Sequence, residues 1–594
     1  MSKPAVFEDI LIDESNIEFK LALDFVNQTN RLIYLTGKAG TGKSTFIQFL
    51  SRTTKKKAVI IAPTGVSAIH AGGQTIHSFF SIDPKVYIPN DKRLRKVAEK
   101  NDVIKSTIYN HFKFSSERLQ LLRSLELLII DEVSMVRCDL LDVIDRILRV
   151  FRGKENEPFG GVQVVLVGDP FQLPPVAKPD EWKLLEPYYK SRFFFHSKVI
   201  QDNKPVYIEF KKIYRQNDLV FIELLNRLRV DKATKQDIDL LFSKYNPTFT
   251  SNDHKHFITI STHSKTVNSI NLTKLAELAG EVKSFEALIS GDFLEKDMPT
   301  DKLLHLKEGA QIIFIKNDSA KRYYNGKIGK ISNLENNSII VETQEGQQIV
   351  LDRYTWHKIK YTWNAELGII EEEKIGSFTQ YPIKLAWAIT VHKSQGLTFE
   401  NVYADLAGSF ASGQVYVALS RCTSFEGIVL KSPIFQFSII SSPEVIEFSQ
   451  NETSNSQIMQ DLINGKADFF YKKARVNIEA DNFSEAYTNL LEALRYRNDI
   501  ENEAFKKYFI IKGKQLSNYK RKFQSIYEEI EPIKKQNKKL TANASKSTKS
   551  KVTTPSDTKK LKKDILLLKA KIKELEKLNH ALKLMLKPKP ASKF

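Results

Sequence analysis

The chain has 594 residues, 42% of them hydrophobic and 27% charged, with a formal net charge of +20. This length exceeds what a single core can organise, so we expect several domains, and no apolar run approaches the roughly 20 residues that cross a bilayer. The N-terminal segment lacks an apolar signal core, and the two cysteines, Cys138 and Cys422, cannot build a disulfide framework or a zinc site on their own. We therefore expect a cytoplasmic protein without a membrane partner.

The positive charge is concentrated in the last part of the chain. Residues 503–594 contain 26 Lys plus Arg against 8 Asp plus Glu, which gives this segment +18 and leaves +2 for the first 502 residues. The long N-terminal region is therefore almost neutral, and the basic character belongs to the tail.

A predicted helical lead-in over residues 1–30 precedes the most specific motif of the chain, at residues 37–44. The motif matches the pattern of Gly, four residues, Gly, Lys, then Ser or Thr, and it lies between an apolar strand (residues 31–36) and a helical run. Glycines let backbone amides approach phosphate oxygens, and a helix N-terminus adds partial positive charge. The phosphates are expected to contact Gly37, Lys38, Ala39, Gly40, Thr41, Gly42, Lys43, Ser44 and Thr45.

Two residues of this motif have specific predicted roles. Lys43 should reach the β- and γ-phosphates of a nucleotide, and Ser44 should hold Mg²⁺. The alternative is a glycine-rich turn between a strand and a helix with no ligand.

The next predicted strand, residues 58–62, is continuously apolar and ends in Pro-Thr-Gly. Strands that alternate with helices in this way indicate a parallel sheet with helices on both faces. Residues 81–120 are polar and rich in lysine, so we interpret them as an insertion rather than as core.

A third apolar strand, residues 127–130, ends in two adjacent carboxylates. Beside a phosphate loop, Asp131 can hold hydrated Mg²⁺ and Glu132 can orient and deprotonate the attacking water. The alternative is that the two acids only end the strand. An amphipathic helical stretch follows over residues 133–152.

A fourth buried strand leads into the rigid turn of residues 168–175. There Gln172 would face the γ-phosphate, where an amide can sense the state of the nucleotide and pass it beyond the turn.

Beyond residue 200 the α/β pattern restarts, and short strands with Gly and Asn turns over residues 309–360 predict an all-β insertion. The α/β pattern resumes at residue 383. Arg215 and Arg421 fall in this second unit, from which they could reach across a cleft to the γ-phosphate and make closure depend on nucleotide.

These stretches resemble a superfamily 1B DNA helicase of the petite-integration-frequency type, related to bacterial RecD-like enzymes, over about residues 15–432. The resemblance is carried by seven motifs in order, at residues 37–45, 62–80, 128–135, 168–175, 214–216, 388–398 and 414–422.

The resemblance implies an α/β fold with two RecA-like motor domains and an α-helical C-terminal region. The first motor domain would span residues 1–200, with a wedge at about 81–120, and the second would span 201–308 and 381–440. An SH3-like barrel would occupy residues 309–380.

The resemblance also implies a function: ATP-driven 5′-to-3′ translocation on single-stranded DNA with unwinding of duplex junctions, in genome maintenance. Gln172 would couple ATP to DNA, Arg215 and Arg421 would contact the γ-phosphate beside Lys43 and Glu132, and Gly396 would approach it through its backbone. The implied DNA contacts are Thr64, Gly65, His77, His392 and Lys393. Two alternatives stay open: a nucleotide-gated DNA-binding scaffold or translocase without strand separation, and an RNA-directed remodeller.

One position departs from the pattern. Many relatives carry a glutamine upstream of the phosphate loop that reads adenine, whereas this chain has Glu-Phe-Lys at residues 18–20. The sequence leaves open whether the base is read loosely or through backbone groups.

The C-terminal region lies outside the resemblance. Residues 464–530 are expected to be helical and to include one tetratricopeptide-like hairpin, which cannot bury its face alone, and residues 536–558 to form a flexible basic linker. Heptads follow, with Leu at d and Ile or a lone Asn at a, so we predict a parallel coiled coil at residues 559–587 and a homodimer through residues 557–587. The alternative is a single basic helix docked on the motor or on DNA.

Overall fold

The computed structural model describes residues 13, 16–98, 106–249 and 257–547, apart from 217, 317, 319, 321, 324, 336, 337, 344, 365–368, 407, 410, 451 and 452. The chain divides into two compact units, Met1–Asp461 and Leu462–Phe594. None of the helices within the described ranges is long and apolar enough to cross a bilayer.

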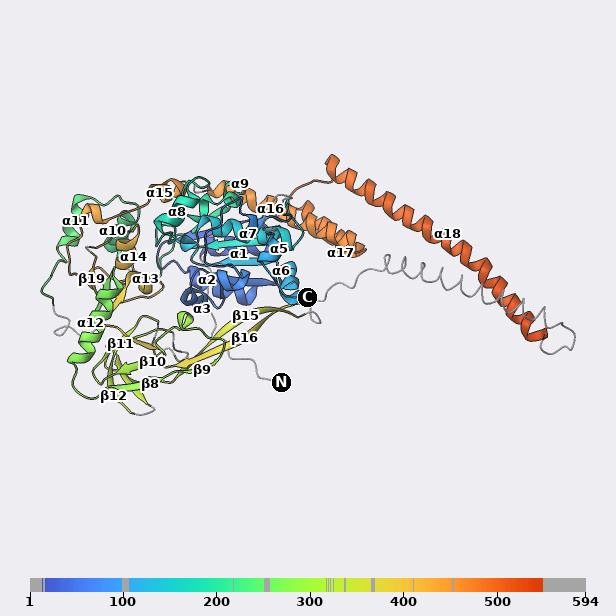
Figure 1. The fold of residues 1–594 in the computed structure, drawn as a ribbon. Helices are drawn as coiled ribbons and strands as arrows, with labels where there is room; N and C mark the ends of the chain where they lie inside the picture. Colours follow the sequence, from blue (N-terminus) through green and yellow to red (C-terminus); the bar gives the residue numbers. More distant parts are fainter. Residues whose placement is uncertain are drawn as a thin grey trace. The chain divides into compact units, whose positions relative to one another are not determined.

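The first lobe of the larger unit is built on a six-stranded parallel sheet (Figure 1). Its order is β3 (Gln74–Thr75), β2 (Ala58–Ala62), β4 (Leu127–Ile130), β5 (Gln163–Val167), β1 (Ile33–Gly37) and β6 (Val206–Phe210). The central strands are buried along their whole length, as continuous apolar runs require in a sheet covered on both faces. The predicted parallel α/β core is therefore confirmed.

Helices complete this lobe. They are α1 (Ile17–Gln28), α2 (Lys43–Thr53), α3 (Gly65–Ala71), α4 (Ile76–Phe80), α5 (Ile108–His111), α6 (Ser116–Ser124), α7 (Cys138–Phe151), α8 (Pro179–Leu185), α9 (Lys198–Asp202) and, from much later in the chain, α15 (Pro443–Ser449). Phe448 of α15 stacks on Phe195 with ring centroids 4.2 Å apart, so this late helix belongs to the first lobe.

Two predictions about the domain organisation were wrong. We placed the start of the second motor domain at residue 201, but β6 pairs with β1 in the first sheet, because Val206 and Phe210 are buried there. We also interpreted residues 81–120 as an insertion outside the core. Their few apolar side chains, Tyr87, Ile108 and Phe112 among them, are buried in the core of the first lobe, so a polar average concealed a packed face.

The second lobe has a four-stranded parallel sheet in the order β18 (Ala388–Thr390), β7 (Ile258–Ser261), β19 (Val402–Asp405) and β20 (Ile428–Leu430). Its helices are α10 (Leu219–Arg229), α11 (Lys235–Phe242), α12 (Ser264–Glu277), α13 (Val391–Ser394) and α14 (Gln414–Leu419). In both lobes the motifs follow the carboxyl ends of strands, the edge where open α/β sheets bind ligands.

Antiparallel strands fill the chain between α12 and β18. One sheet has the order β14 (Gln348–Val350), β13 (Ile339–Thr343), β12 (Ile328–Leu334), β11 (Gln311–Phe314) and β17 (Ile383–Leu385). Smaller sheets join β15 (Tyr354–Asn364), β16 (Ile369–Gln380) and β9 (Leu288–Gly291), and β10 (Leu303–Leu306) with β8 (Lys283–Glu286). The β insertion thus begins near residue 283, earlier than the predicted 309. The β15–β16 hairpin returns to the first lobe and lies against α6 (Figure 1).

The C-terminal helices are α16 (Asn455–Glu479), α17 (Phe483–Leu494) and α18 (Glu503–Ser547). The Tyr471 hydroxyl of α16 donates to the Arg497 carbonyl at 2.8 Å and accepts from the Asp499 amide at 2.9 Å, which fixes the chain that follows α17. The linker predicted from residue 536 is wrong up to residue 547, because α18 continues through it. This stretch contains no Gly or Pro, and its three Lys, two Ala, one Gln and one Leu favour helix. The predicted coiled coil lies outside the described residues.

Candidate functional site between the two lobes

The phosphate-loop motif forms the turn between β1 and α2. Gly37, Gly40 and Gly42 have φ values of +153°, +82° and +86°, which side-chain-bearing residues rarely adopt. A Cβ on Gly40 would lie 2.5 Å from the Cβ of Arg215, so glycine also lets the loop approach the chain that follows β6 closely.

Lys43 lies at the centre of this loop. Its Nζ donates to the carbonyl oxygens of Gly37 and Lys38 at 2.5 and 3.0 Å. Burial lowers the pKa of Lys43 to about 8, against the attraction of Asp169 and Glu132. Ser44 and Thr45 lie in the first turn of α2 and are exposed, so a ligand on the loop could reach them.

The two predicted carboxylates lie directly after β4. Burial, and then the charge of Glu132, raise the pKa of Asp131 to about 7, and burial also raises the pKa of Glu132. The Glu132 backbone has φ +50° and ψ 44°, an uncommon conformation for a residue other than glycine. Two adjacent acids with raised pKa values favour a bound cation, which would stabilise their ionised forms.

These residues fit a magnesium ion bound chiefly through phosphate and water. No group of three or more His, Cys, Asp or Glu side chains in the described parts of the chain could hold a metal ion by itself. Mg²⁺ commonly keeps several waters and takes one or two protein ligands plus substrate phosphates. Ser44 and Asp131 could supply ligands of this kind.

The site includes a residue that sequence reasoning missed. Gln395, which follows α13 in the second lobe, donates through Nε2 to Glu132 Oε2 at 2.7 Å and to Gln172 Oε1 at 3.1 Å. Gln395 therefore joins the acidic pair to the buried Gln172 across the lobes. Its position inside the motif at residues 388–398 was the available signal, but the motif does not tell which of its polar side chains points inward.

The two predicted arginines lie together beside the phosphate loop. Arg215 belongs to the connection after β6 rather than to the second lobe, and its Nη1 donates to the Ser420 carbonyl at 3.3 Å. Burial, and then the charge of Arg421, lower the pKa of Arg215 to about 9. Arg421 is only 2% exposed, and the charge of Glu132 partly offsets the effect of burial on its pKa. Two crowded guanidinium groups are suited to an anionic ligand with several charges.

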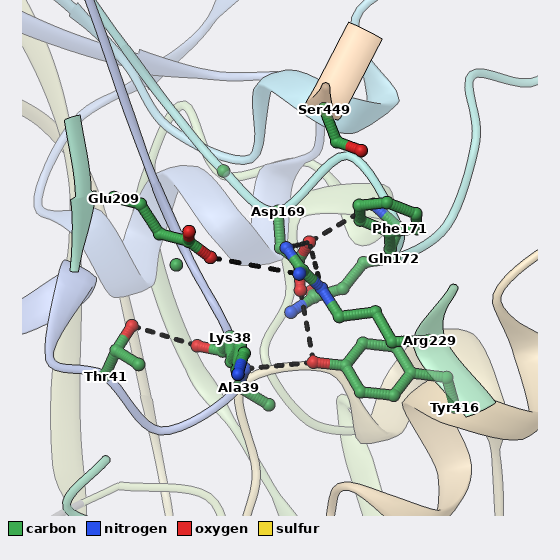
Figure 2. A network of polar contacts seen from close by, with 12 residues as sticks. Lys38, Ala39, Thr41, Asp169, Phe171, Gln172, Glu209, Arg229, Tyr416 and Ser449 are labelled. Carbon is green, nitrogen blue, oxygen red and sulfur yellow. Dashed lines mark hydrogen bonds and ion pairs between the residues drawn. The ribbon is translucent and has the colours of Figure 1, made fainter. Parts of the chain in front are cut away.

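A second polar network, shown in Figure 2, connects the lobes behind the loop. Asp169, at the end of β5, accepts from Arg229 of α10 at 2.9 Å and from the Tyr416 hydroxyl of α14 at 3.2 Å. That hydroxyl in turn accepts from the Ala39 amide of the phosphate loop at 3.1 Å. The sequence analysis assigned a role to neither residue, although Tyr416 lies inside the motif at residues 414–422.

The predicted DNA contacts are divided between the lobes. Thr64 caps α3 through its hydroxyl, which accepts from the Ser67 amide, and Gly65 begins that helix. His77 lies in α4 of the first lobe, whereas His392 and Lys393 are exposed on α13 of the second.

Further basic groups interact electrostatically with one another and with Lys393 of the second set. Desolvation and the charges of Lys384 and Lys316 lower the pKa of His70 on α3. Burial, and then the charge of Lys393, lower the pKa of Lys384 on β17 to about 8. These four groups from both lobes form a basic cluster, defined here as His70, Lys316, Lys384 and Lys393, of which the sequence analysis named only Lys393.

Two parallel-sheet lobes with a phosphate loop, an acidic strand end and clustered arginines define a two-lobed P-loop nucleotidase motor. A model of the PIF1-like helicase family matches residues 11–237. Among curated proteins, human PIF1 is 34% identical over 67% of this chain and 57% of its own length, and Campylobacter jejuni Pif1 is 32% identical over 66% and 87%. Unliganded Pif1 from Bacteroides sp is 40% identical, with a TM-score of 0.68 over 76% of this chain and 99% of that one.

The chain therefore belongs to the PIF1-like helicase family. It spans less than two thirds of the length of the vertebrate relatives it matches, which are covered over 57–59%.

Proposed function

We propose that the chain is an ATP-dependent DNA helicase that moves 5′-to-3′ along single-stranded DNA and unwinds duplex junctions. The observation that carries this proposal is the hydrogen-bonded path from Glu132 through Gln395 to Gln172. This path joins the acidic pair to α13, whose His392 and Lys393 are predicted DNA contacts. A movement of α13 on binding DNA would therefore shift Glu132, and a movement of Glu132 on binding nucleotide would shift α13.

In this proposal, the chain's own groups prepare the site for hydrolysis. Lys43 and the loop amides would hold the phosphates of ATP, and Ser44 and Asp131 would hold Mg²⁺, which would neutralise phosphate charge when bound. Glu132 would accept a proton from the attacking water at its carboxylate. Arg215 and Arg421 would stabilise negative charge that develops on the γ-phosphate.

DNA as the partner is supported by the basic cluster and by the relatives. The cluster of His70, Lys316, Lys384 and Lys393 includes groups from α3, which begins at Gly65, and from α13, and clustered cations attract a phosphate backbone. Bacteroides Pif1 has been solved in complex with ADP-AlF4 and bound to ssDNA, at 41% and 40% identity to this chain.

Strand separation on tailed duplexes tests the proposal. ATP hydrolysis and unwinding are measured on duplexes with a 5′ or a 3′ single-stranded tail, for the full chain and for Glu132→Gln. The control is Glu426→Gln, which changes an exposed carboxylate paired with Lys244 at 2.9 Å. We expect unwinding of the 5′-tailed duplex alone, loss of activity in Glu132→Gln with nucleotide binding retained, and full activity in the control.

Other outcomes would point to the alternatives. Hydrolysis stimulated by DNA without unwinding from either tail would indicate a translocase or clamp. Stimulation by single-stranded RNA but not by DNA would indicate an RNA-directed remodeller.

We also propose that residues 557–587 mediate a homodimer, on the basis of their heptads and their opposite charges at g and e. Sedimentation of the full chain tests this. Dimers that become monomers when residues 557–594 are deleted support the proposal, and a full chain that is monomeric at high micromolar concentration refutes it.

A further inference from the structure

The network in Figure 2 contains a hydroxyl that touches the phosphate loop from the opposite lobe. Tyr416 of α14 accepts a hydrogen bond from the Ala39 amide at 3.1 Å and donates one to Asp169 Oδ2 at 3.2 Å. Since a hydroxyl can donate and accept at once, this single atom connects a loop amide to a carboxylate.

The carboxylate end of this connection also organises the turn that carries Gln172. Asp169 Oδ1 accepts from the Phe171 amide at 3.2 Å, and the Asp169 carbonyl accepts from the Gln172 amide at 3.1 Å. A shift of Asp169 would therefore move Gln172, which contacts Gln395 and through it Glu132.

The network is well shielded from water, which strengthens its electrostatic contacts. Asp169, Tyr416 and Arg229 are 0%, 4% and 7% exposed. The Arg229 guanidinium lies 2.9 Å from Asp169, 3.9 Å from Glu209 of β6 and 4.3 Å from the centre of the Phe171 ring. Its charge thus balances that of Asp169 inside the interface between the lobes.

Helix α14 is also held against the first lobe at its beginning. A Cβ on Gly413 would overlap the carbonyl oxygens of Phe171 and Gln172, so the helix starts in close backbone contact with this turn. At the other end of the helix, the Ser420 carbonyl accepts from Arg215 Nη1 at 3.3 Å. Tyr416 lies between these two points and reaches the phosphate loop itself.

We propose that Tyr416 is a positioning residue that couples the phosphate loop to the Gln172 turn, so that bound DNA accelerates hydrolysis. This inference rests on the proposed ATPase and DNA-binding function. A movement of the loop that displaces the Ala39 amide is transmitted through the Tyr416 hydroxyl to Asp169 and then to Gln172. A phenyl ring without the hydroxyl fills the same space but transmits nothing.

The test is Tyr416→Phe, with Tyr403→Phe as the matched control. Tyr403 lies in the same lobe, is 9% exposed and donates to the Pro247 carbonyl at 3.4 Å, far in sequence from the loop. ATP hydrolysis is measured with and without single-stranded DNA, together with the melting temperature. For Tyr416→Phe we expect the DNA-stimulated kcat to fall about tenfold, a loss within the range of typical coupling energies between two sites. The KM for ATP should change less than about threefold. Tyr403→Phe should match the wild type.

A second variant keeps the test decisive if Tyr416→Phe is unstable. Arg229→Lys keeps the charge beside Asp169 but loses the planar fork. We expect it to lower DNA stimulation as well, and the double variant to lose less than the product of the two single losses, because both act through Asp169.

Four results would overturn the inference. DNA stimulation of Tyr416→Phe within twofold of the wild type removes the coupling role. A KM that rises in proportion to the loss of kcat/KM, or an equal loss in Tyr403→Phe, reduces the effect to packing or nucleotide binding. A wild-type chain whose hydrolysis ignores DNA refutes the proposed function, and this inference with it.

Discussion

Replacing Gln395 with methionine should disconnect the acidic pair from Gln172. The amide of Gln395 makes two contacts across the lobes, at 2.7 Å to the Glu132 carboxylate and at 3.1 Å to Gln172. Methionine has a similar volume but no N–H group, so the change removes both hydrogen bonds with little loss of packing.

The expected size of the effect follows from the contact with the carboxylate. A hydrogen bond to a charged group contributes about 1.5–3 kcal/mol, which corresponds to a roughly 10- to 150-fold loss of kcat if it is made in the transition state. The KM for ATP should change little, because Gln395 contacts Glu132 and Gln172 and acts on the acidic pair rather than on the loop residues that would hold the phosphates.

Steady-state ATP hydrolysis with saturating single-stranded DNA measures this loss. The matched control is Gln311→Met on β11, whose amide donates to the backbone carbonyls of Phe257 and Ala386, away from the site. The control should lose stability but keep its kcat. A Gln395→Met variant with kcat within twofold of the wild type would refute the assignment of this path to hydrolysis.

Three further predictions test the basic cluster, the loop and the tail. The protonated form of Lys384 attracts phosphate, and its pKa is about 8, so the affinity for single-stranded DNA should fall as the pH rises through 8. Fluorescence anisotropy should show a weaker pH dependence of DNA binding in Lys384→Met than in the wild type. The same pH profile in both would exclude Lys384 from the DNA interface. Gly40→Ala should lower kcat roughly 100-fold, because its Cβ would displace Arg215. Gly72→Ala is the control: at φ +70° its added Cβ would meet no atom within 4 Å beyond its chain neighbours, so it should cost only about 1–2 kcal/mol of backbone strain. Equal kcat values for the two variants would contradict the predicted clash at Gly40. Deleting residues 503–594, which carry +18, should flatten the salt dependence of DNA binding, and an unchanged slope would mean that these lysines do not contact DNA.

The sequence by itself determined the parts of the site that are continuous in the chain. The phosphate loop, the acids at residues 131 and 132 and the Gln172 turn each follow a buried apolar strand. A continuous apolar run of this kind can be recognised in the sequence without knowing which strands lie beside it. The order of strands and helices then implied two parallel sheets, and both were found.

The average composition of a segment led to wrong assignments where the structure depends on a few packed side chains or on hydrogen bonds. The segment at residues 81–120 is polar overall, yet a handful of apolar side chains fixes it in the core. The composition of strand β6 suits either lobe, and its hydrogen bonds to β1 place it in the first sheet. Helix α18 continues through lysine-rich sequence that also suits a linker, because lysine tolerates both.

Tertiary structure alone decided which ordinary polar residues meet at the site. Gln395 and Glu132 are 263 residues apart, Tyr416 and Ala39 are 377 apart, and Arg229 and Asp169 are 60 apart. Glutamine, tyrosine and arginine occur throughout any soluble protein, so their types carry no signal. Their partners are fixed by how two separately folded sheets pack against each other, and that packing depends on the whole surface of each lobe rather than on any local pattern.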